Sequence, residues 1–170
     1  MAELVLLKVD VIVVATAEAA LAAKHGTRAI PIVAVDPADA VAIGLVANLA
    51  RPGGNVTGLS YLGTELVDKQ TELLKEAVAT LSRMAVLTNP ANPTHSPRLR
   101  AAVVAAQRLG VKAEPIEART QGDLDKAFAK MTRMRVGGTL VLTDPMFGAA
   151  AGRLARRRAV CPQCTDSRVM

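Results

Sequence analysis

The chain has 170 residues, of which 51% are hydrophobic and 21% are charged, and its formal net charge is +6. This balance excludes an intrinsically disordered chain and predicts a globular one. With one tyrosine, two phenylalanines and no tryptophan, the chain lacks the aromatic side chains on which bases stack, so we expect no nucleic-acid partner.

The first part of the chain alternates between strand-like and helix-like patterns. Thr16 can cap the helix that follows it, because its side-chain oxygen can accept from a free N–H of the first turn, and Gly26 suits the end of that helix. The β-branched run that comes next has no helical period, which predicts a parallel strand buried on both faces. The expected elements are the end of a helix at Met1–Lys8, a buried strand at Val9–Ala15, a helix at Ala17–Lys24 and a buried strand at Ile32–Val35.

Asp36 and Pro37 are expected to end this strand and to begin another helix. Proline suits the first turn of a helix, and the Asp36 carboxylate can accept from the free N–H groups there. The segment Arg51–Asn55 contains a proline and two glycines, which stop the helix, and Val56–Leu59 is extended again. The apolar residues of the predicted helix recur at a spacing of three to four and are Val41, Leu45, Val46 and Leu49.

A second series of the same kind follows Ser60. Thr64 is expected to cap its first helix, and Gly110 to stop its second. The alternation of strands and helices predicts an α/β fold with parallel sheets flanked by helices. Helices are expected at Thr64–Thr80, Ser96–Leu109, Gln121–Arg133 and Ala149–Arg158, and strands at Arg83–Thr88, Val111–Ala118 and Gly137–Thr143.

Polar or turn-forming residues follow four of the predicted strands. Ligands of open α/β sheets bind beyond the carboxyl ends of the strands, so these positions are candidate binding residues. Carboxylates and amides there can hold an amine or a carboxylate, and helix N-termini favour anionic groups. Each side chain can equally serve as a helix cap or turn former. The four candidates are Thr16, Asp36, Asn89 and Asp144.

Three ordered segments of the chain resemble one known family. They read DPADAVAIGLVANLARPGGNVTGLS at Asp36–Ser60, ELLKEAVATLSRMAVLTNPANP at Glu72–Pro93 and VLTDPMF at Val141–Phe147. They are similar to the ABC-transporter substrate-binding proteins of the tryptophan/tyrosine type, over roughly Glu3 to Phe147. This resemblance implies a two-lobed fold of the type I periplasmic-binding kind, in which two α/β lobes joined by a hinge hold a small ligand in a cleft.

The resemblance also implies a function without catalysis. A protein of this kind captures an amino-acid-like solute and presents its closed form to an ABC permease. By resemblance the four strand-end residues named above are carried over as ligand contacts. Such proteins are extracytoplasmic, commonly lipoproteins, whereas the residues after Met1 show no secretory signal pattern.

The resemblance divides the chain into a partial first lobe at residues 1–58, a partial second lobe at 59–160 and an irregular tail at 161–170. The crossing between lobes is expected near Gly54–Tyr61. Met1 is expected to enter partway through the first lobe, and the tail has the character of frame-shifted sequence. Strands missing from the sheets would leave edges uncovered and favour self-association.

Catalytic, metal and cofactor chemistry have little support in the sequence. The chain contains no GxSxG, HExxH, Walker-type or GxGxxG pattern, and we expect no enzyme activity and no cofactor. Cys161 and Cys164 form a single CxxC pair, which supplies two metal ligands rather than four, so we expect no metal site. We interpret His25 and His95 as exposed helix-end and loop residues.

Two other function classes stay open at this point. One is the ligand-sensing part of a transcription regulator, which would need a helix-turn-helix before the lobes. The other is a small Rossmann-like or flavodoxin-like α/β enzyme, which would need a phosphate loop after the first strand.

Overall fold

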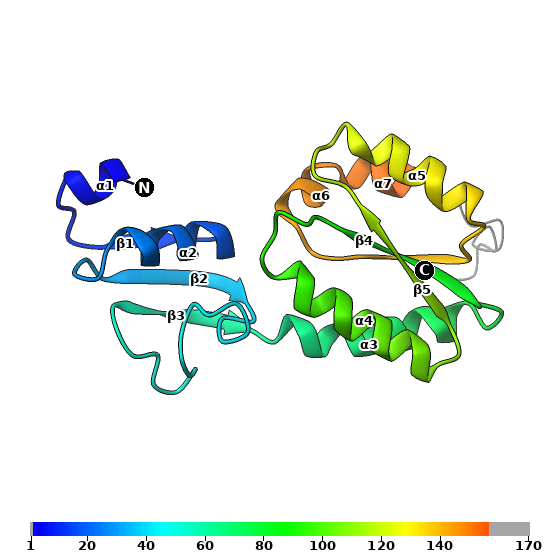
Figure 1. Cartoon of the computed structure of the whole chain (residues 1–170), viewed down its shortest axis with the longest axis horizontal. Helices are drawn as coiled ribbons and strands as arrows, with labels where there is room; N and C mark the ends of the chain where they lie inside the picture. The colour runs from blue at the N-terminus through cyan, green and yellow to red at the C-terminus, as the bar shows by residue number, and fades with distance from the viewer. Residues whose placement is uncertain (1, 157–170) are drawn as a thin grey trace. The chain divides into compact units, whose positions relative to one another are not determined.

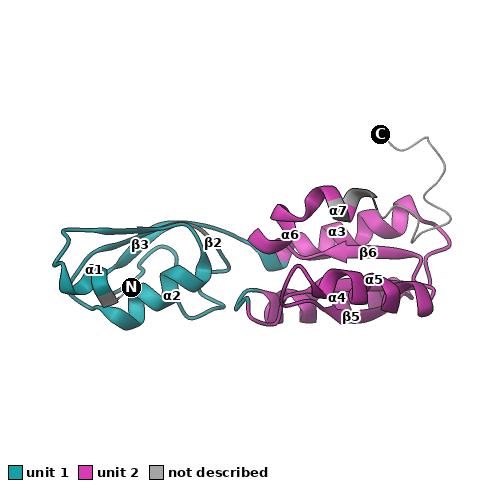
Figure 2. Ribbon diagram, turned by 90° about the horizontal axis from the view of Figure 1, so that it is seen from above, with its two compact units in different colours: residues 1–64, 92–94 teal, residues 65–91, 95–170 magenta. Residues whose placement is uncertain are grey.

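The structure is a computed structural model that describes residues 2–156, except for the side chains of residues 2, 36, 153, 155 and 156. The chain divides into two compact units (Figure 2): unit 1 contains residues 1–64 and 92–94, and unit 2 contains residues 65–91 and 95–170. Each unit has its own three-stranded parallel sheet, so the predicted α/β fold with parallel sheets flanked by helices is confirmed.

Unit 1 is built on a sheet with the strand order β1-β2-β3 (Figure 1). Helix α2 packs on this sheet through Ala20 and Ala23, which are fully buried against Ile12 and Ile32. Small alanine side chains let a helix approach the strands closely and still exclude water. The elements are α1 at Ala2–Leu6, β1 at Ile12–Val14, α2 at Ala17–Gly26, β2 at Ile32–Ala38 and β3 at Val56–Tyr61.

The expectation that the strand at Ile32–Val35 is buried on both faces is wrong, and the strand before it is also buried on one face only. Alternate side chains of β1 and β2 point to opposite faces, and only one of these faces is covered by the core of the unit. Val13 on β1, Val35 on β2 and Leu59 on β3 are 65%, 42% and 75% exposed. Among the described residues of unit 1, the second face of the sheet is therefore largely bare.

The helix expected after Asp36 is also absent. Strand β2 continues through Pro37 to Ala38, and residues 39–50 form turns and bends. The single helical turn that forms is closed by Gly44, which has φ of 73°. The Gly44 N–H donates to the carbonyl of Val41, and the Leu45 N–H donates to the carbonyl of Ala40. This pair of bonds is a Schellman motif, which ends the helix after one turn.

The close approach of β2 and β3 depends on Gly58. Gly58 pairs with Ala34 across the two strands and has φ of 149°. A Cβ atom at this position would overlap the backbone carbonyl of Ala34. Only glycine can occupy such a position without moving a strand.

Unit 2 is built around β4, the central strand of the order β5-β4-β6. Its side chains alternate between two cores: Ala85 and Leu87 pack with α5 and α6, whereas Met84 and Val86 pack with α3 and α4. Figure 1 shows the two groups of helices on opposite faces of the sheet. The elements are α3 at Gly63–Ala77, β4 at Arg83–Thr88, α4 at His95–Arg108, β5 at Lys112–Glu117, α5 at Asp123–Arg133, β6 at Gly138–Val141, α6 at Pro145–Ala149 and α7 at Ala151–Arg156.

Some helices of unit 2 begin at other residues than the sequence predicted. Thr64 lies inside α3 rather than before it, since the helix already begins at Gly63. Pro145 begins α6 directly after Asp144, so the last predicted helix is replaced by α6 and α7. Strand β3 lies whole within unit 1, and the chain leaves that unit after Thr64. The predicted tail at 161–170 lies outside the described residues.

Candidate functional site

Two of the predicted site residues are brought together at the carboxyl ends of neighbouring strands in unit 2. β4 and β6 run parallel and adjacent, so both end at the same edge of the sheet. Asn89 directly follows β4, and Asp144 lies in the connection between β6 and α6. The Nδ2 atom of Asn89 donates to Oδ2 of Asp144 at 3.1 Å, across 55 positions of sequence.

Asp144 has a structural role that its burial makes plain. Its Oδ1 atom accepts from the Met146 N–H at 2.8 Å, so Asp144 is the N-cap of α6, as the alternative interpretation of the sequence allowed. The side chain is only 4% exposed. Asn89 is half-buried and its Oδ1 accepts from the Ala91 N–H at 3.0 Å. Asn89 is therefore the member of the pair that solvent, or a solute, can reach.

His95 completes this cluster, and the prediction that it is an exposed loop residue is wrong. It is the first residue of α4 and is 1% exposed. Its ring also packs near Phe147, with the two ring centres 6.2 Å apart. The other histidine, His25, is exposed in the last turn of α2, as predicted.

The hydrogen bonds of His95 determine which ring nitrogen carries the proton. The Asn89 backbone N–H can only donate, and it lies 2.8 Å from Nδ1, so Nδ1 is the acceptor. The Thr88 hydroxyl lies 3.2 Å from the same atom. Nε2 lies 3.1 Å from the carbonyl oxygen of Thr143, which can only accept. His95 is thus a neutral imidazole with its proton on Nε2.

In unit 1 the structure places Thr16 where the sequence predicted it. Thr16 follows β1, is half-buried and caps α2, because its Oγ1 accepts from the Ala19 N–H at 3.2 Å. The backbone of Asp36 lies in β2, while its side chain lies outside the described part of the chain. The expected capping role of Asp36 is wrong, because no helix begins there.

Sequence reasoning missed two polar residues at the ends of β2 and β3. The hydroxyl of Ser60 donates to the carbonyl of Pro37 at 2.7 Å and accepts from the Ala40 N–H at 3.2 Å. Asp39 is 8% exposed, and its Oδ1 accepts from the Thr64 N–H at 3.0 Å. Asp39 lies in the segment DPADA and Ser60 in the segment GLSY. A small polar residue next to a predicted strand is the sequence signal that could have identified each of them as a strand-end group.

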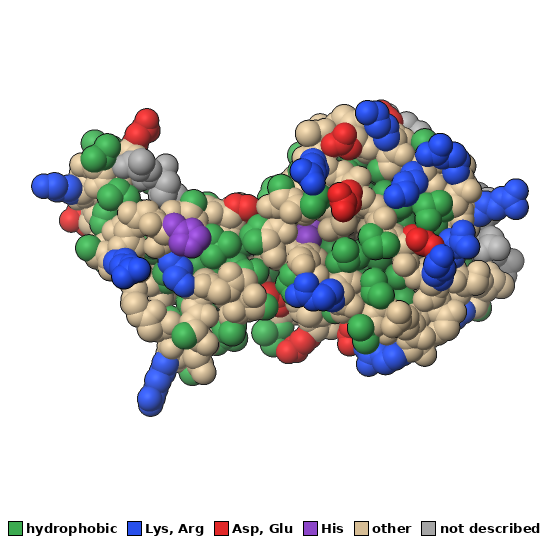
Figure 3. All heavy atoms as spheres, in the orientation of Figure 1, with side chains coloured by type: hydrophobic (Ala, Val, Ile, Leu, Met, Phe, Trp, Pro, Cys, Tyr) green, Lys and Arg blue, Asp and Glu red, His purple; other side chains and the backbone are tan. Residues whose placement is uncertain are grey.

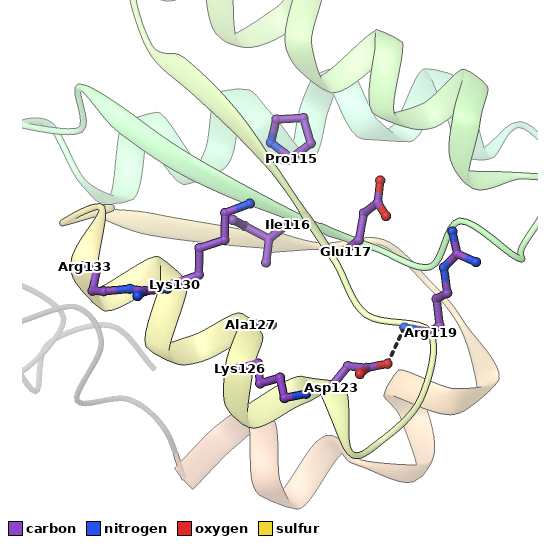
Figure 4. A pocket seen from close by; sticks show the side chains of 9 residues that line it. All are labelled: Pro115, Ile116, Glu117, Arg119, Asp123, Lys126, Ala127, Lys130 and Arg133. Carbon is purple, nitrogen blue, oxygen red and sulfur yellow. Dashed lines mark hydrogen bonds between the residues drawn. The ribbon is translucent and has the colours of Figure 1, made fainter.

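A hollow in unit 2 lies away from these residues, between the edge strand β5 and α5 (Figure 4). Its volume is about 490 Å³, and Arg119, Lys126, Lys130 and Arg133 line it. Figure 3 shows basic side chains gathered over this region. Oδ2 of Asp123, which also lines the hollow, accepts hydrogen bonds from the Thr120 hydroxyl and from the backbone N–H groups of Thr120 and Arg119. These hydrogen bonds lower the pKa of the Asp123 carboxyl. Glu117 and Asp123 also line this groove, so its lining carries both signs of charge with the basic side chains in excess.

A smaller, apolar hollow of about 160 Å³ lies in unit 1 beside the ends of β2 and β3. Its lining includes Leu45, Val46 and Leu49 from the segment after β2, and residues 58–60 of β3. The Ser60 hydroxyl is already bonded within the unit, so this hollow offers apolar contact more than directed hydrogen bonds.

Metal-ligand groups and long apolar helices are both absent from the described residues 2–156. Within that range no three His, Cys, Asp or Glu side chains lie together as metal ligands. No described helix is long and apolar enough to cross a bilayer. The Cys161–Cys164 pair lies outside the described residues.

Comparisons with known proteins agree with the α/β arrangement of parallel strands and helices. A family model described as ABC transporter substrate binding protein matches residues 1–155. The chain belongs to this family, and the resemblance found in the sequence is confirmed.

Individual relatives are similar over part of their length. A tyrosine-binding protein of Clostridioides difficile (strain R20291) is 39% identical over 83 residues, which are 48% of this chain and 23% of that protein. The structure of an ABC domain in complex with L-Trp from Streptococcus pneumoniae has a TM-score of 0.83 and 21% identity, covering 94% of this chain and 53% of that one. A conserved domain protein from Vibrio cholerae has a TM-score of 0.70 and 29% identity, covering 76% and 43%.

This chain therefore spans about half, or less, of the length of the relatives it matches. The structural likeness at 21% identity shows the shared fold. Among these relatives, the Clostridioides difficile protein is tyrosine-binding by name, and the Streptococcus structure is in complex with L-Trp.

Proposed function

We propose that this chain is the solute-binding part of an ABC importer and that it binds an amino-acid-like solute, of which aromatic amino acids are the first candidates. The observation that carries this proposal is the pair Asn89 and Asp144 at the joined carboxyl ends of β4 and β6. Ligands of α/β sheets bind at this edge. The names of the relatives, one tyrosine-binding and one in complex with L-Trp, support the choice of solute.

Asn89 offers the contact that such a solute needs. One N–H of its side-chain amide donates to Asp144, and the second has no partner among the described residues. Because the amide is only half-buried, this second N–H can donate to a carboxylate or carbonyl oxygen of the solute. Asp144 would act through Asn89, since its carboxylate is nearly inaccessible. Thr16 and Asp36 remain proposed contacts in unit 1.

The partner that follows from this function is an ABC permease, and the place of action is outside the cytoplasm. Both are proposals that rest on the family. Neither requires catalysis, because the free energy of solute binding alone can shift a protein between conformations.

Calorimetric titration tests the proposal. We expect L-Trp or L-Tyr to bind the chain saturably, and the Asn89→Ala variant to bind about tenfold more weakly, the cost of one lost hydrogen bond to a charged group. Gln107→Ala, at an exposed position of α4, is the matched control and should bind like the wild type. Equal affinity of Asn89→Ala and wild type would remove Asn89 from the site.

A further inference from the structure

We propose that His95 is a positioning residue that holds Asn89 in the orientation needed to bind the solute. This inference deepens the proposed function and rests on it. His95 does not touch the solute in this account. It acts through the backbone N–H of Asn89 and through the segment that carries Asp144.

The ring of His95 links the two segments that form the candidate site. Nδ1 accepts from Asn89, which follows β4, and Nε2 donates to the Thr143 carbonyl, one residue before Asp144. The imidazole thus spans the ends of β4 and β6 with one hydrogen bond to each. These are the same two segments that the Asn89–Asp144 hydrogen bond joins through side chains.

The arrangement differs from that of an ordinary buried histidine that satisfies its own helix. His95 opens α4, yet both of its nitrogens bond to groups outside that helix. A buried imidazole with both nitrogens engaged has one allowed ring orientation and one tautomer. The ring therefore holds the backbone N–H of Asn89 in one position.

The charged groups around the ring are consistent with a neutral imidazole acting as a link. Asp144 comes from the connection after β6, with Oδ2 at 3.7 Å from Nε2, and Arg98 is buried one turn further along α4. Thr88 and Phe147 add neutral contacts from the end of β4 and from α6. At 3.7 Å the carboxylate is beyond hydrogen-bond distance, whereas the Thr143 carbonyl is within it.

Two variants of His95 separate positioning from simple stability. His95→Phe keeps a ring of similar size and removes both hydrogen bonds. His95→Asn can keep an oxygen near the position of Nδ1 and so retain an acceptor for the Asn89 N–H. Met131→Ala shortens a fully buried side chain of the same unit that takes part in none of the hydrogen bonds described above, and it serves as a control for loss of stability.

The experiment combines calorimetry with nuclear magnetic resonance on the chain of residues 1–170. We expect His95→Phe to lower the affinity for L-Trp or L-Tyr about tenfold. His95→Asn should recover part of this loss, and Met131→Ala should bind like the wild type. The imidazole nitrogen shifts of the wild type should show a neutral ring protonated on Nε2. Wild-type affinity in His95→Phe, or a ring protonated on Nδ1 at neutral pH, would overturn the inference.

A failure of the proposed function can be told apart from a failure of this inference. If the wild type binds neither L-Trp nor L-Tyr, the proposed function is wrong. The chemical shifts of the Asn89 amide groups then test the role of His95 on their own. His95→Phe should shift both the backbone and side-chain amide signals of Asn89 towards those of an unstructured asparagine, whereas Met131→Ala should not. Unchanged Asn89 signals in His95→Phe would overturn the positioning role.

Discussion

The Nδ1 atom of His95 accepts a hydrogen bond of 2.8 Å from the backbone N–H of Asn89, six residues earlier in the chain. A helix and the strand before it are thereby tied together by a side chain that water does not reach. The bond fixes the turn between β4 and α4 and presents the Asn89 side chain to the end of β6, where Asp144 receives it. The candidate site of unit 2 is therefore built from two strand ends and the start of one helix.

Substitutions of Asp144 should separate its two oxygens. In Asp144→Asn one oxygen remains to cap α6, so the free energy of unfolding should fall by less than about 1 kcal/mol. The new NH₂ group of residue 144 would however face the NH₂ group of Asn89, and two donors cannot form a hydrogen bond. Asn89 would lose its fixed orientation, and solute affinity should fall about tenfold. Asp144→Ala should cost about 1–2 kcal/mol of stability. Urea unfolding and calorimetry check these changes. Equal unfolding midpoints in Asp144→Ala and wild type would contradict the capping role.

Gly58→Ala should strongly destabilise unit 1. The added Cβ would overlap the Ala34 carbonyl, and φ of 149° is strained for any side chain, so we expect a loss of about 2 kcal/mol or more. Gly122→Ala is the matched control, since its φ is −67° and its nearest contact is an ordinary one. The control should change stability by less than about 1 kcal/mol. Thermal unfolding followed by circular dichroism measures both, and similar effects of the two variants would contradict the close approach of β2 and β3.

The bare sheet face of unit 1 should promote association between copies of the chain. Val13, Val35 and Leu59 expose apolar surface on neighbouring strands, and parallel sheets are normally covered on both faces. Light scattering coupled to size-exclusion chromatography should show species larger than a monomer, and the double variant Val13→Thr and Leu59→Thr should reduce them. Leu66→Thr, at another exposed leucine, is the control. A wild type that stays monomeric at all concentrations would contradict this prediction.

Asp123 should make stability depend on pH in the acid range. The Thr120 side chain and the backbone N–H groups of Thr120 and Arg119 lower the pKa of Asp123 below its ordinary 3.8. A carboxyl whose pKa is lower in the folded state contributes stability that is present above its unfolded pKa and lost as the pH falls through its folded pKa. Asp123→Ala should therefore lower the melting temperature at pH 7, and the gap to wild type should close as the pH falls below 3.8. A gap that stays constant down to pH 2 would contradict the hydrogen-bonded carboxylate.

The parts of the fold that the sequence predicted correctly are those set by local chemistry. Thr16 caps α2 and Gly110 follows α4, as their residue types indicated. The helix at 41–49 could not be excluded by periodicity, because the apolar spacing is helical and a single glycine, Gly44, ends it after one turn. The exposure of Val13 and Leu59 depends on which elements cover the sheet, and strand patterns carry no such information.

The candidate site was predictable in position but not in its interactions. The rule that ligands bind at strand ends pointed to Asn89 and Asp144, which the structure joins. His95 was missed because a lone histidine after a proline-rich turn carries no sign of burial. Its role follows from a contact with Thr143, 48 residues away, and only the folded sheet brings these two residues together.

Calorimetric titration of L-Trp and L-Tyr into the chain, with Asn89→Ala and Gln107→Ala measured in parallel, tests the central claim most directly. The account predicts saturable binding to the wild type and to Gln107→Ala, and affinity about tenfold lower for Asn89→Ala. Absence of binding to the wild type, or the same affinity in all three proteins, would contradict it.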